Sequence, residues 1–200
     1  MQLLAVLLLS YFLGGLPTGL LLGKALANTD IRQSGSGNIG STNALRTLGI
    51  KIGLLTFAGD FGKGALAVWL ARLLVPYDPL AIAFALFFSV FGHCYSPFLH
   101  FSGGKGVATI CGAMMVVDAP LTLFWLAVFF IIVISSRLVS LGSLLAVSGS
   151  TIQTLFFTGH PPVIRVALLF CAVVCVYRHK ENIHRLVHGK EARLGDNHAR

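Results

Sequence analysis

Charged residues are scarce in this chain. Lys, Arg, Asp and Glu together make up 11% of the 200 residues, whereas 56% are hydrophobic and the mean hydropathy is +0.83. So low a charge content excludes an ordinary soluble domain and predicts one integral membrane domain over residues 1–200. The length suits an all-α polytopic protein, a compact bundle of about seven transmembrane helices.

Cysteine is also rare and gives no sign of a disulfide or a metal site. All four cysteines lie within apolar runs: Cys94, Cys111, Cys171 and Cys175. Cysteines in such surroundings are typical of small buried residues. We therefore expect them to contribute to helix packing.

No positive charge precedes the first apolar run, which argues against a secretory signal. The run covers about residues 3–22, and the first basic residue, Lys24, follows it. Because Lys and Arg favour the cytoplasmic side, the first helix is predicted to be retained with the N-terminus external. Four glycines predict a close-packing face on it: Gly14, Gly15, Gly19 and Gly23.

Six further apolar segments follow the first one. They cover about residues 53–75, 80–99, 107–117, 121–134, 141–157 and 163–177. Segments 107–117 and 121–134 are shorter than the ~20 residues of a perpendicular span, so a re-entrant pair is the alternative there. Most of the net charge of +8 lies in the loops predicted to be cytoplasmic and at the C-terminus. The basic excess therefore predicts a cytoplasmic C-terminus and contact with anionic headgroups, rather than nucleic acid.

The most polar stretch of the first half is Ser34–Arg46, which reads SGSGNIGSTNALR. Glycines allow successive backbone N–H groups to form a concave anion-binding nest. Arg46 adds a planar fork suited to phosphate or carboxylate. A plain polar loop would account for the glycines and serines, but poorly for two asparagines and a terminal arginine. We favour an anion site within segment 32–46.

A second glycine-rich turn, segment 101–109, reads FSGGKGVAT and leads directly into an apolar helix. The N-terminus of a helix has free N–H groups and a positive dipole end, so an anion binds well beside Lys105. The segment lacks the spacing of a nucleotide P-loop, and no parallel sheet is expected.

The third polar motif is segment 178–186, RHKENIHRL. His179 and Asn182 are three residues apart, so a helix would present both on one face. For the basic residues around them, a helix lying on anionic headgroups is the alternative. His184 and His188 have the spacing of a zinc pair, but no third ligand is evident, so no metal is expected.

Two polar features lie inside apolar segments. Asp60 and Lys63 are three residues apart, and we expect them to pair or to face a wet cavity. A structural ion pair and a role in the site are both open. Gln153 is expected to make a hydrogen bond between helices.

All three motifs are predicted on the cytoplasmic face. By themselves they indicate an enzyme or carrier for an anionic, phosphate-containing substrate at the membrane interface. A transporter of a phosphorylated metabolite is the alternative, although no internal repeat is evident.

Four motifs in this order carry a specific resemblance: SGSGNxGxTNxxR, DxxKG, GGKGVAT and RHxENIxRL. Together they resemble the bacterial acyl-phosphate:glycerol-3-phosphate acyltransferases, the PlsY family. The resemblance implies seven helices and an active site on the cytoplasmic side of the inner membrane. It implies transfer of a fatty acyl group from acyl phosphate to the sn-1 hydroxyl of glycerol 3-phosphate, the first step of phospholipid synthesis. No cofactor is implied, and enzymes that supply acyl phosphate are possible partners.

The resemblance also implies roles for individual residues. The implied catalytic residues are Ser36, Arg46, Lys105, His179 and Asn182. The implied substrate-binding residues are Gly35, Gly37, Asn38, Gly40, Thr42, Asn43, Lys63, Gly103, Gly104, Gly106, Glu181 and Arg185. Two positions depart from the family pattern: Ser41 replaces an alanine, and Ser102 replaces a lysine, which removes one cation.

The implied chemistry needs no covalent intermediate, because acyl phosphate already has a good leaving group. Either His179 or the phosphate oxygen of the donor takes the hydroxyl proton. An acylated Ser36 ranks lower, since no Ser-His-carboxylate arrangement can be identified.

Overall fold

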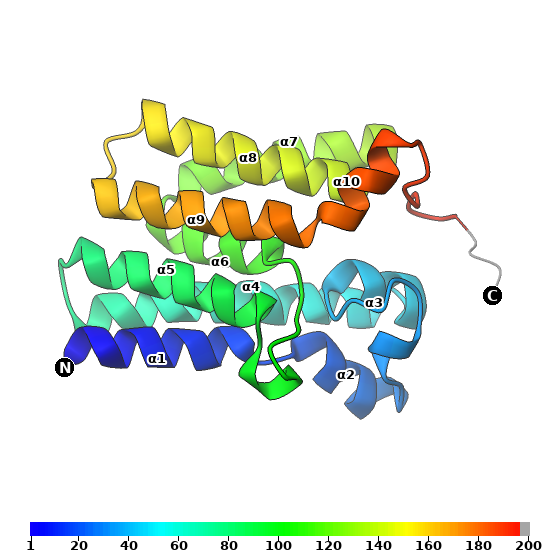
Figure 1. The fold of residues 1–200 in the computed structure, drawn as a ribbon, viewed down its shortest axis with the longest axis horizontal. Coiled ribbons are helices and arrows are strands. Elements are labelled where there is room, and N and C mark those ends of the chain that lie inside the picture. Colours follow the sequence, from blue (N-terminus) through cyan, green and yellow to red (C-terminus); the bar gives the residue numbers. More distant parts are fainter. Residues whose placement is uncertain (197–200) are drawn as a thin grey trace.

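The computed structural model describes residues 1–196, and the regular structure in these residues is helical (Figure 1). The helices are α1 (Gln2–Gly15), α2 (Thr18–Ala27), η1 (Ile31–Gln33), α3 (Ser41–Leu48), α4 (Ile50–Leu74), α5 (Pro79–Cys94), η2 (Pro97–Leu99), α6 (Val107–Val117), α7 (Ala119–Ser136), α8 (Val139–Phe157), α9 (Pro162–Arg178) and α10 (Lys180–Val187).

Several helices are long and apolar enough to cross a membrane. They are α4, α7, α8 and the stretch Gln2–Ala27, which contains α1 and α2, while α9 and α10 form a further candidate bent by 60°. The helices α5 and α6 are apolar but shorter. The all-α membrane architecture is thus confirmed. The number of crossings and the sides on which the termini lie stay predictions.

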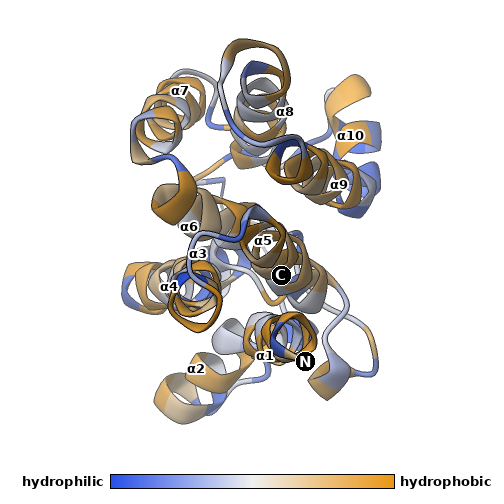
Figure 2. Cartoon of the chain, turned by 90° about the vertical axis from the view of Figure 1, so that its left-hand side faces the viewer, coloured by the Kyte–Doolittle hydropathy of each residue, from blue (hydrophilic) through white to orange (hydrophobic). Residues whose placement is uncertain are grey.

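The bundle is held by close helix contacts. α1 packs against α4 and α5, α4 against α6, and α5 against α9, as the end-on view in Figure 2 shows. A Cβ at Gly14 would lie 2.0 Å from the Ser89 carbonyl oxygen, and one at Gly64 would lie 2.2 Å from that of Thr109. Small residues allow backbones to approach this closely, so the predicted packing role of Gly14 is confirmed.

The prediction of one continuous first helix is wrong in one respect. The run breaks at Leu16 and Pro17 into α1 and α2. Proline has no N–H and disfavours the helical conformation of the preceding residue. The Gly15 carbonyl accepts from the Ser96 hydroxyl (2.6 Å), and the Leu16 carbonyl accepts from Lys63 Nζ (2.8 Å). The carbonyls at the break are therefore satisfied by Lys63 of α4 and by Ser96 of the turn between α5 and η2.

Other boundaries also differ from the sequence prediction. The segment predicted as 80–99 leaves the helix at Tyr95, shortly before Pro97 opens η2. The segment predicted as 121–134 is the 18-residue helix α7, because Pro120 is tolerated in its first turn. The predicted loop between the first two spans contains a helix of its own, α3.

The polar motifs gather at one end of the bundle. Figure 1 shows α3 and α10 at the end opposite the N-terminus. A hydrogen bond from Lys105 to Asn182 joins the turn before α6 to α10, and one from Arg46 to Ala192 joins α3 to the segment after α10. Segments far apart in sequence therefore meet there.

Candidate functional site

One buried side chain, Asn43, shapes the first motif. Its amide nitrogen donates to the carbonyls of Ile31, Ser34 and Asn38 at 3.0, 3.1 and 2.9 Å. Its Oδ1 accepts from the backbone N–H of Ser36 at 2.9 Å. The carboxamide is thus engaged within the loop, while the Ser36 side chain is exposed. Asn43 supports the loop that would carry Ser36.

Glycine is required where this loop turns. Gly35 and Gly37 have φ of +61° and +68°, in the left-handed region. A Cβ at Gly35 would also lie 2.3 Å from Asn43 Oδ1. Before α3, Asn38 Oδ1 accepts from the Gly40 N–H at 2.9 Å. The sequence therefore folds here into a turn with little side-chain cover.

Arg46 extends from α3 toward the C-terminal segment. Its Nη2 donates to the Ala192 carbonyl at 2.9 Å. Its Nε is buried and makes no hydrogen bond within residues 1–196. A buried guanidinium donor without a partner is costly in the protein alone, so this group is well suited to an anionic ligand.

The second motif is pressed against the end of α5. The Gly104 N–H donates to the His93 carbonyl at 3.0 Å. A Cβ at Gly103 would lie 2.2 Å from that oxygen, and one at Gly104 would lie 2.0 Å from His93 Nε2. Gly106, with φ of +88°, is the N-cap of α6. Glycine is therefore required at positions 103 and 104 by the close approach to α5, and at position 106 by the left-handed backbone.

A guanidinium holds the same turn from the other side. Arg178 Nη2 donates to the Gly103 carbonyl at 2.6 Å, and Nε donates to the Gly104 carbonyl at 3.0 Å. The guanidinium also lies over the Tyr95 ring, 5.6 Å from its centroid. The last residue of α9 is thereby attached to the glycine-rich turn.

Lys105 begins a polar network that joins the second and third motifs. Its Nζ donates to Asn182 Oδ1 at 2.5 Å, and Asn182 Nδ2 donates to Glu191 Oε1 at 2.6 Å. Arg185 Nε donates to Glu191 Oε2 at 2.8 Å. An ammonium group has three donor hydrogens, so Lys105 retains donors for a ligand.

Burial lowers the pKa of Lys105 to about 8, which the negative charge of Glu191 opposes and the positive charges of Arg185 and Arg46 reinforce. These groups therefore lie close enough to act on one another. Burial alone would raise the pKa of Glu191, but hydrogen bonds from Asn182 and Arg185 hold it below its usual value. The result is a cationic site with one internal carboxylate.

His179 follows α9 directly and is buried. Its Nδ1 donates to the Cys175 carbonyl at 2.8 Å. Because a carbonyl only accepts, the proton is on Nδ1 and the lone pair of the neutral ring is on Nε2. Burial, helped by the positive charge of Lys105 and opposed by the Cys175 hydrogen bond, lowers the pKa of His179 to about 4. The ring is neutral near pH 7 and can accept a hydrogen bond.

Lys63 belongs to a different cluster, inside the bundle. Its Nζ lies 2.8 Å from Asp60 Oδ1, so the predicted pairing is confirmed. Asp60 also accepts from the Thr18 hydroxyl at 2.5 Å, and His93 Nδ1 lies 3.4 Å away. Lys63 Nζ also donates to the Leu16 carbonyl at the break after α1. These contacts support the fold around the site.

The remaining predicted residues make fewer contacts. The Thr42 side chain makes no hydrogen bond within residues 1–196, and Glu181 is exposed on α10. Gln153 Oε1 accepts from Trp125 Nε1 at 2.7 Å, which confirms the expected bond between helices. The site roles of individual residues stay predictions.

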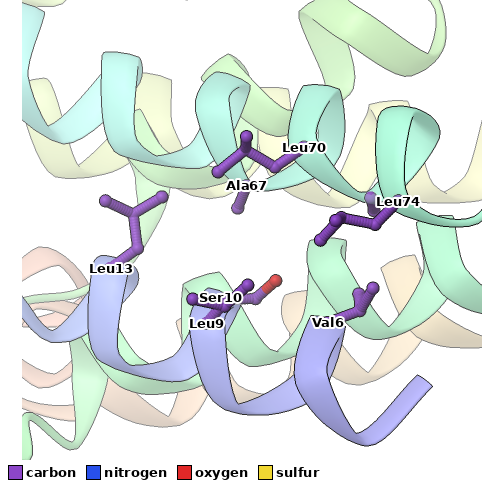
Figure 3. Close-up of a pocket in the computed structure, with 8 residues that line it drawn as sticks. Val6, Leu9, Ser10, Leu13, Ala67, Leu70 and Leu74 are labelled. Carbon is purple, nitrogen blue, oxygen red and sulfur yellow. The ribbon is translucent and has the colours of Figure 1, made fainter. Parts of the chain in front are cut away.

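Among residues 1–196, no three His, Cys, Asp or Glu side chains are placed to hold a metal ion. The rings of His184 and His188 stack with centroids 4.3 Å apart. A small crevice between α1 and α4 is lined by apolar side chains and Ser10 (Figure 3). It offers no charged group, so the cationic end is the candidate site.

Three contributors to the site were not predicted as site residues. Glu191 lies beyond the last motif in a short polar segment, where sequence gives no sign of a partner. Arg178 stands inside the third motif, but its attachment to a distant turn has no sequence signal. His93 precedes the second motif. The only sequence signal for its position was the pair Gly103 and Gly104, because two successive glycines indicate that another part of the chain lies too close for a side chain.

Comparison with known proteins gives a consistent result. The family model described as glycerol-3-phosphate acyltransferase matches residues 4–189. The chain is 40% identical to the glycerol-3-phosphate acyltransferase of Syntrophotalea carbinolica over 94% of this chain and 96% of that protein. It is 44% identical to that of Trichlorobacter lovleyi, over 92% and 94%.

Solved structures are similar as well. The crystal structure of PlsY (YgiH), an integral membrane glycerol 3-phosphate acyltransferase in its glycerol 3-phosphate form, matches with a TM-score of 0.91. The two chains are 36% identical, with 98% of this chain and 96% of that chain covered. Its lysophosphatidic acid form matches with a TM-score of 0.89.

Proposed function

The chain belongs to the glycerol-3-phosphate acyltransferase family, and we propose that it moves a fatty acyl group from acyl phosphate to the sn-1 hydroxyl of glycerol 3-phosphate. The products are lysophosphatidic acid and inorganic phosphate. The observation that carries this proposal is the pair of half-buried cations with unused donors, Arg46 and Lys105, close to the neutral His179. A site with these groups suits two phosphate-bearing reactants.

We assign the phosphate of glycerol 3-phosphate to Lys105 and the turn formed by Gly103, Gly104 and Gly106. Support comes from the spare donors of Lys105 and from the free N–H groups at the start of α6. Arg46 and the exposed Ser36 are then left for the phosphate of the donor. An acyl chain would extend along the apolar helices.

The reaction balances without a cofactor. The sn-1 oxygen forms an ester bond to the acyl carbonyl carbon, and the bond from that carbon to the phosphate oxygen breaks. The electron pair leaves with the phosphate, which Arg46 stabilises as negative charge grows. The protein contributes chiefly by holding the hydroxyl about 3 Å from the carbonyl carbon.

The hydroxyl proton goes to an oxygen of the leaving phosphate. A group with a pKa of about 4, such as His179, is a weak base. An oxygen of the donor phosphate becomes a stronger base as its bond to the acyl carbon breaks and negative charge grows on it. His179 Nε2 instead accepts a hydrogen bond from the hydroxyl and orients it, with Asn182 holding Lys105 in place. We place this site on the cytoplasmic side of the inner membrane.

The direct test is turnover by the purified protein in lipid vesicles. Acyl phosphate and labelled glycerol 3-phosphate should give labelled lysophosphatidic acid and phosphate in equal amounts, acylated at sn-1. An acyl-CoA donor, tested in parallel, should not support the reaction. Uptake of label into vesicles without phosphate release would instead favour a transporter. Turnover by the thioester alone would overturn the assignment of the donor.

A further inference from the structure

The glycine-rich turn Gly103–Gly106 has one side chain, that of Lys105, and its Nζ bonds Asn182 instead of the backbone of the turn. Gly103, Gly104 and Gly106 surround Lys105, and glycine backbones have wide conformational freedom. A turn that binds a phosphate through backbone N–H groups must nevertheless have its peptides facing one way. Some other part of the chain must therefore hold them.

The contacts of Arg178 meet this requirement. Its Nη2 and Nε donate to the two successive carbonyls of Gly103 and Gly104, at 2.6 and 3.0 Å. Two bonds from one rigid guanidinium fix two peptides at once. The ring of Tyr95, 5.6 Å from the guanidinium, supports it from another side.

Peptide geometry then sets where the N–H groups point. In a planar trans peptide, the carbonyl and the following N–H point in opposite directions. With the Gly103 carbonyl toward Arg178, the Gly104 N–H points away and donates to the His93 carbonyl at 3.0 Å. With the Gly104 carbonyl also toward Arg178, the Lys105 N–H points away from the guanidinium. That N–H donates no hydrogen bond within residues 1–196.

The same side chain also sets a distance within the site. Arg178 is the last residue of α9, and His179 follows it directly. Attaching Arg178 to the turn therefore fixes the turn relative to His179. Since Arg178 bonds the carbonyl side of these peptides, it acts from behind the N–H face that a phosphate would use.

We propose that Arg178 is a positioning residue that orients the Gly103–Lys105 backbone for the phosphate of glycerol 3-phosphate and holds it in register with His179, without contacting the substrate. The proposal rests on the proposed acyltransferase function. It predicts a selective defect in the use of glycerol 3-phosphate.

The experiment measures KM for each substrate in Arg178→Gln and Arg178→Lys. Arg178→Gln should raise KM for glycerol 3-phosphate roughly 10- to 100-fold, as expected for losing charge-assisted hydrogen bonds. The KM for acyl phosphate should stay within about twofold of wild type. Arg178→Lys, which reaches one carbonyl, should fall between Arg178→Gln and wild type.

Two matched controls separate positioning from general structure. Arg165 donates to the carbonyls of His160, Leu155 and Thr158 at 2.6, 3.2 and 2.7 Å, at the other end of the bundle. Arg165→Gln should lower thermal stability but leave both KM values unchanged. Lys180→Gln removes an exposed cation two residues from Arg178 and should have little effect on thermal stability or on either KM value.

The outcomes are distinct. Wild-type KM for glycerol 3-phosphate in folded Arg178→Gln or Arg178→Lys would overturn the proposal, as would an equal rise in Arg165→Gln. If Arg178→Gln does not fold, Arg178→Lys decides. If the wild type lacks turnover, the proposed function fails. Equilibrium binding of glycerol 3-phosphate to the same variants then decides the role of Arg178.

Discussion

The two ends of the helix bundle use similar residues for different purposes. At the end beside the N-terminus, Asp118 pairs with His160 at 2.8 Å, and Arg165 donates to three carbonyls around the end of α8. At the other end, Arg46 has a buried Nε without a partner in residues 1–196, and Lys105 uses one donor on Asn182. At the end beside the N-terminus these polar groups are paired within the protein. At the other end, Arg46 and Lys105 have hydrogen-bond donors that no group in residues 1–196 accepts.

The difference indicates which end binds a ligand. Polar groups buried without partners reduce stability, so a fold retains them where a ligand completes the bonds. Charge alone does not separate the ends, because both contain an arginine bound to backbone carbonyls: Arg165 at one and Arg178 at the other. The two arginines differ in what they bind. Arg165 donates to carbonyls at and after the C-terminal end of α8, while Arg178 donates to carbonyls of the glycine-rich turn beside Lys105.

Removing Lys105 should give the largest effect. Lys105→Met should lower kcat/KM for glycerol 3-phosphate about 10²- to 10³-fold, because the charge-assisted hydrogen bonds that bind its phosphate are lost. Arg165→Gln should change kcat/KM less than twofold. Steady-state kinetics with thermal unfolding of each variant would check this. Comparable losses in the two variants would remove the distinction between the ends.

The second-largest effect on catalysis is expected for Gly104→Ala. Its Cβ would lie 2.0 Å from His93 Nε2, so the turn or the buried His93 ring that packs against it must shift. We expect KM for glycerol 3-phosphate to rise roughly 30-fold, since a displacement of about 1 Å near the chemistry is costly. The matched control is Gly62→Ala on α4, where a Cβ meets nothing within 4 Å. An unchanged KM in Gly104→Ala would show that the turn does not bind the phosphate.

The pH dependence should report Lys105. Because the pKa of Lys105 is about 8, the group is charged below that pH and loses its charge above it. The kcat/KM for glycerol 3-phosphate should therefore fall above pH 8, approaching about tenfold per pH unit. In Lys105→Arg the fall should be absent, since arginine stays protonated. A persistent fall in that variant would assign the titration to another group.

The smallest effect is expected for Asp118→Asn. In the wild type, Asp118 Oδ1 accepts a hydrogen bond from the Leu121 N–H at 3.0 Å. The asparagine keeps an oxygen for this bond but removes the negative charge beside His160. The free energy of unfolding should drop by about 0.5–1 kcal/mol, as for a partly exposed pair. Activity should remain within twofold of wild type. A larger loss of activity would mean that the paired end also contributes to catalysis.

Much of the fold was predictable from the sequence because membrane spans are long and apolar. The predicted segments 141–157 and 163–177 correspond to α8 and α9. The break at Leu16 and Pro17 was missed, since a long apolar run outweighed one proline. The carbonyls at this break accept hydrogen bonds from Lys63 on α4 and from Ser96 in the turn after α5. Contacts between segments so far apart in sequence have no local pattern.

The site was predictable in composition but not in its connections. The motifs indicated Arg46, Lys105 and His179, and the structure brings them to one end of the bundle. The sequence did not reveal that the Asn43 amide serves its own loop, nor that Glu191 lies between Asn182 and Arg185. Those partners are set by tertiary packing.

A structure of this chain with glycerol 3-phosphate bound tests the central claim most directly. We predict phosphate oxygens within about 3 Å of Lys105 Nζ and of the N–H groups that begin α6, with the sn-1 hydroxyl toward His179. A phosphate bound on the exposed face of α10 or at the Asp118–His160 end, with Lys105 bonded only to Asn182, would contradict the account.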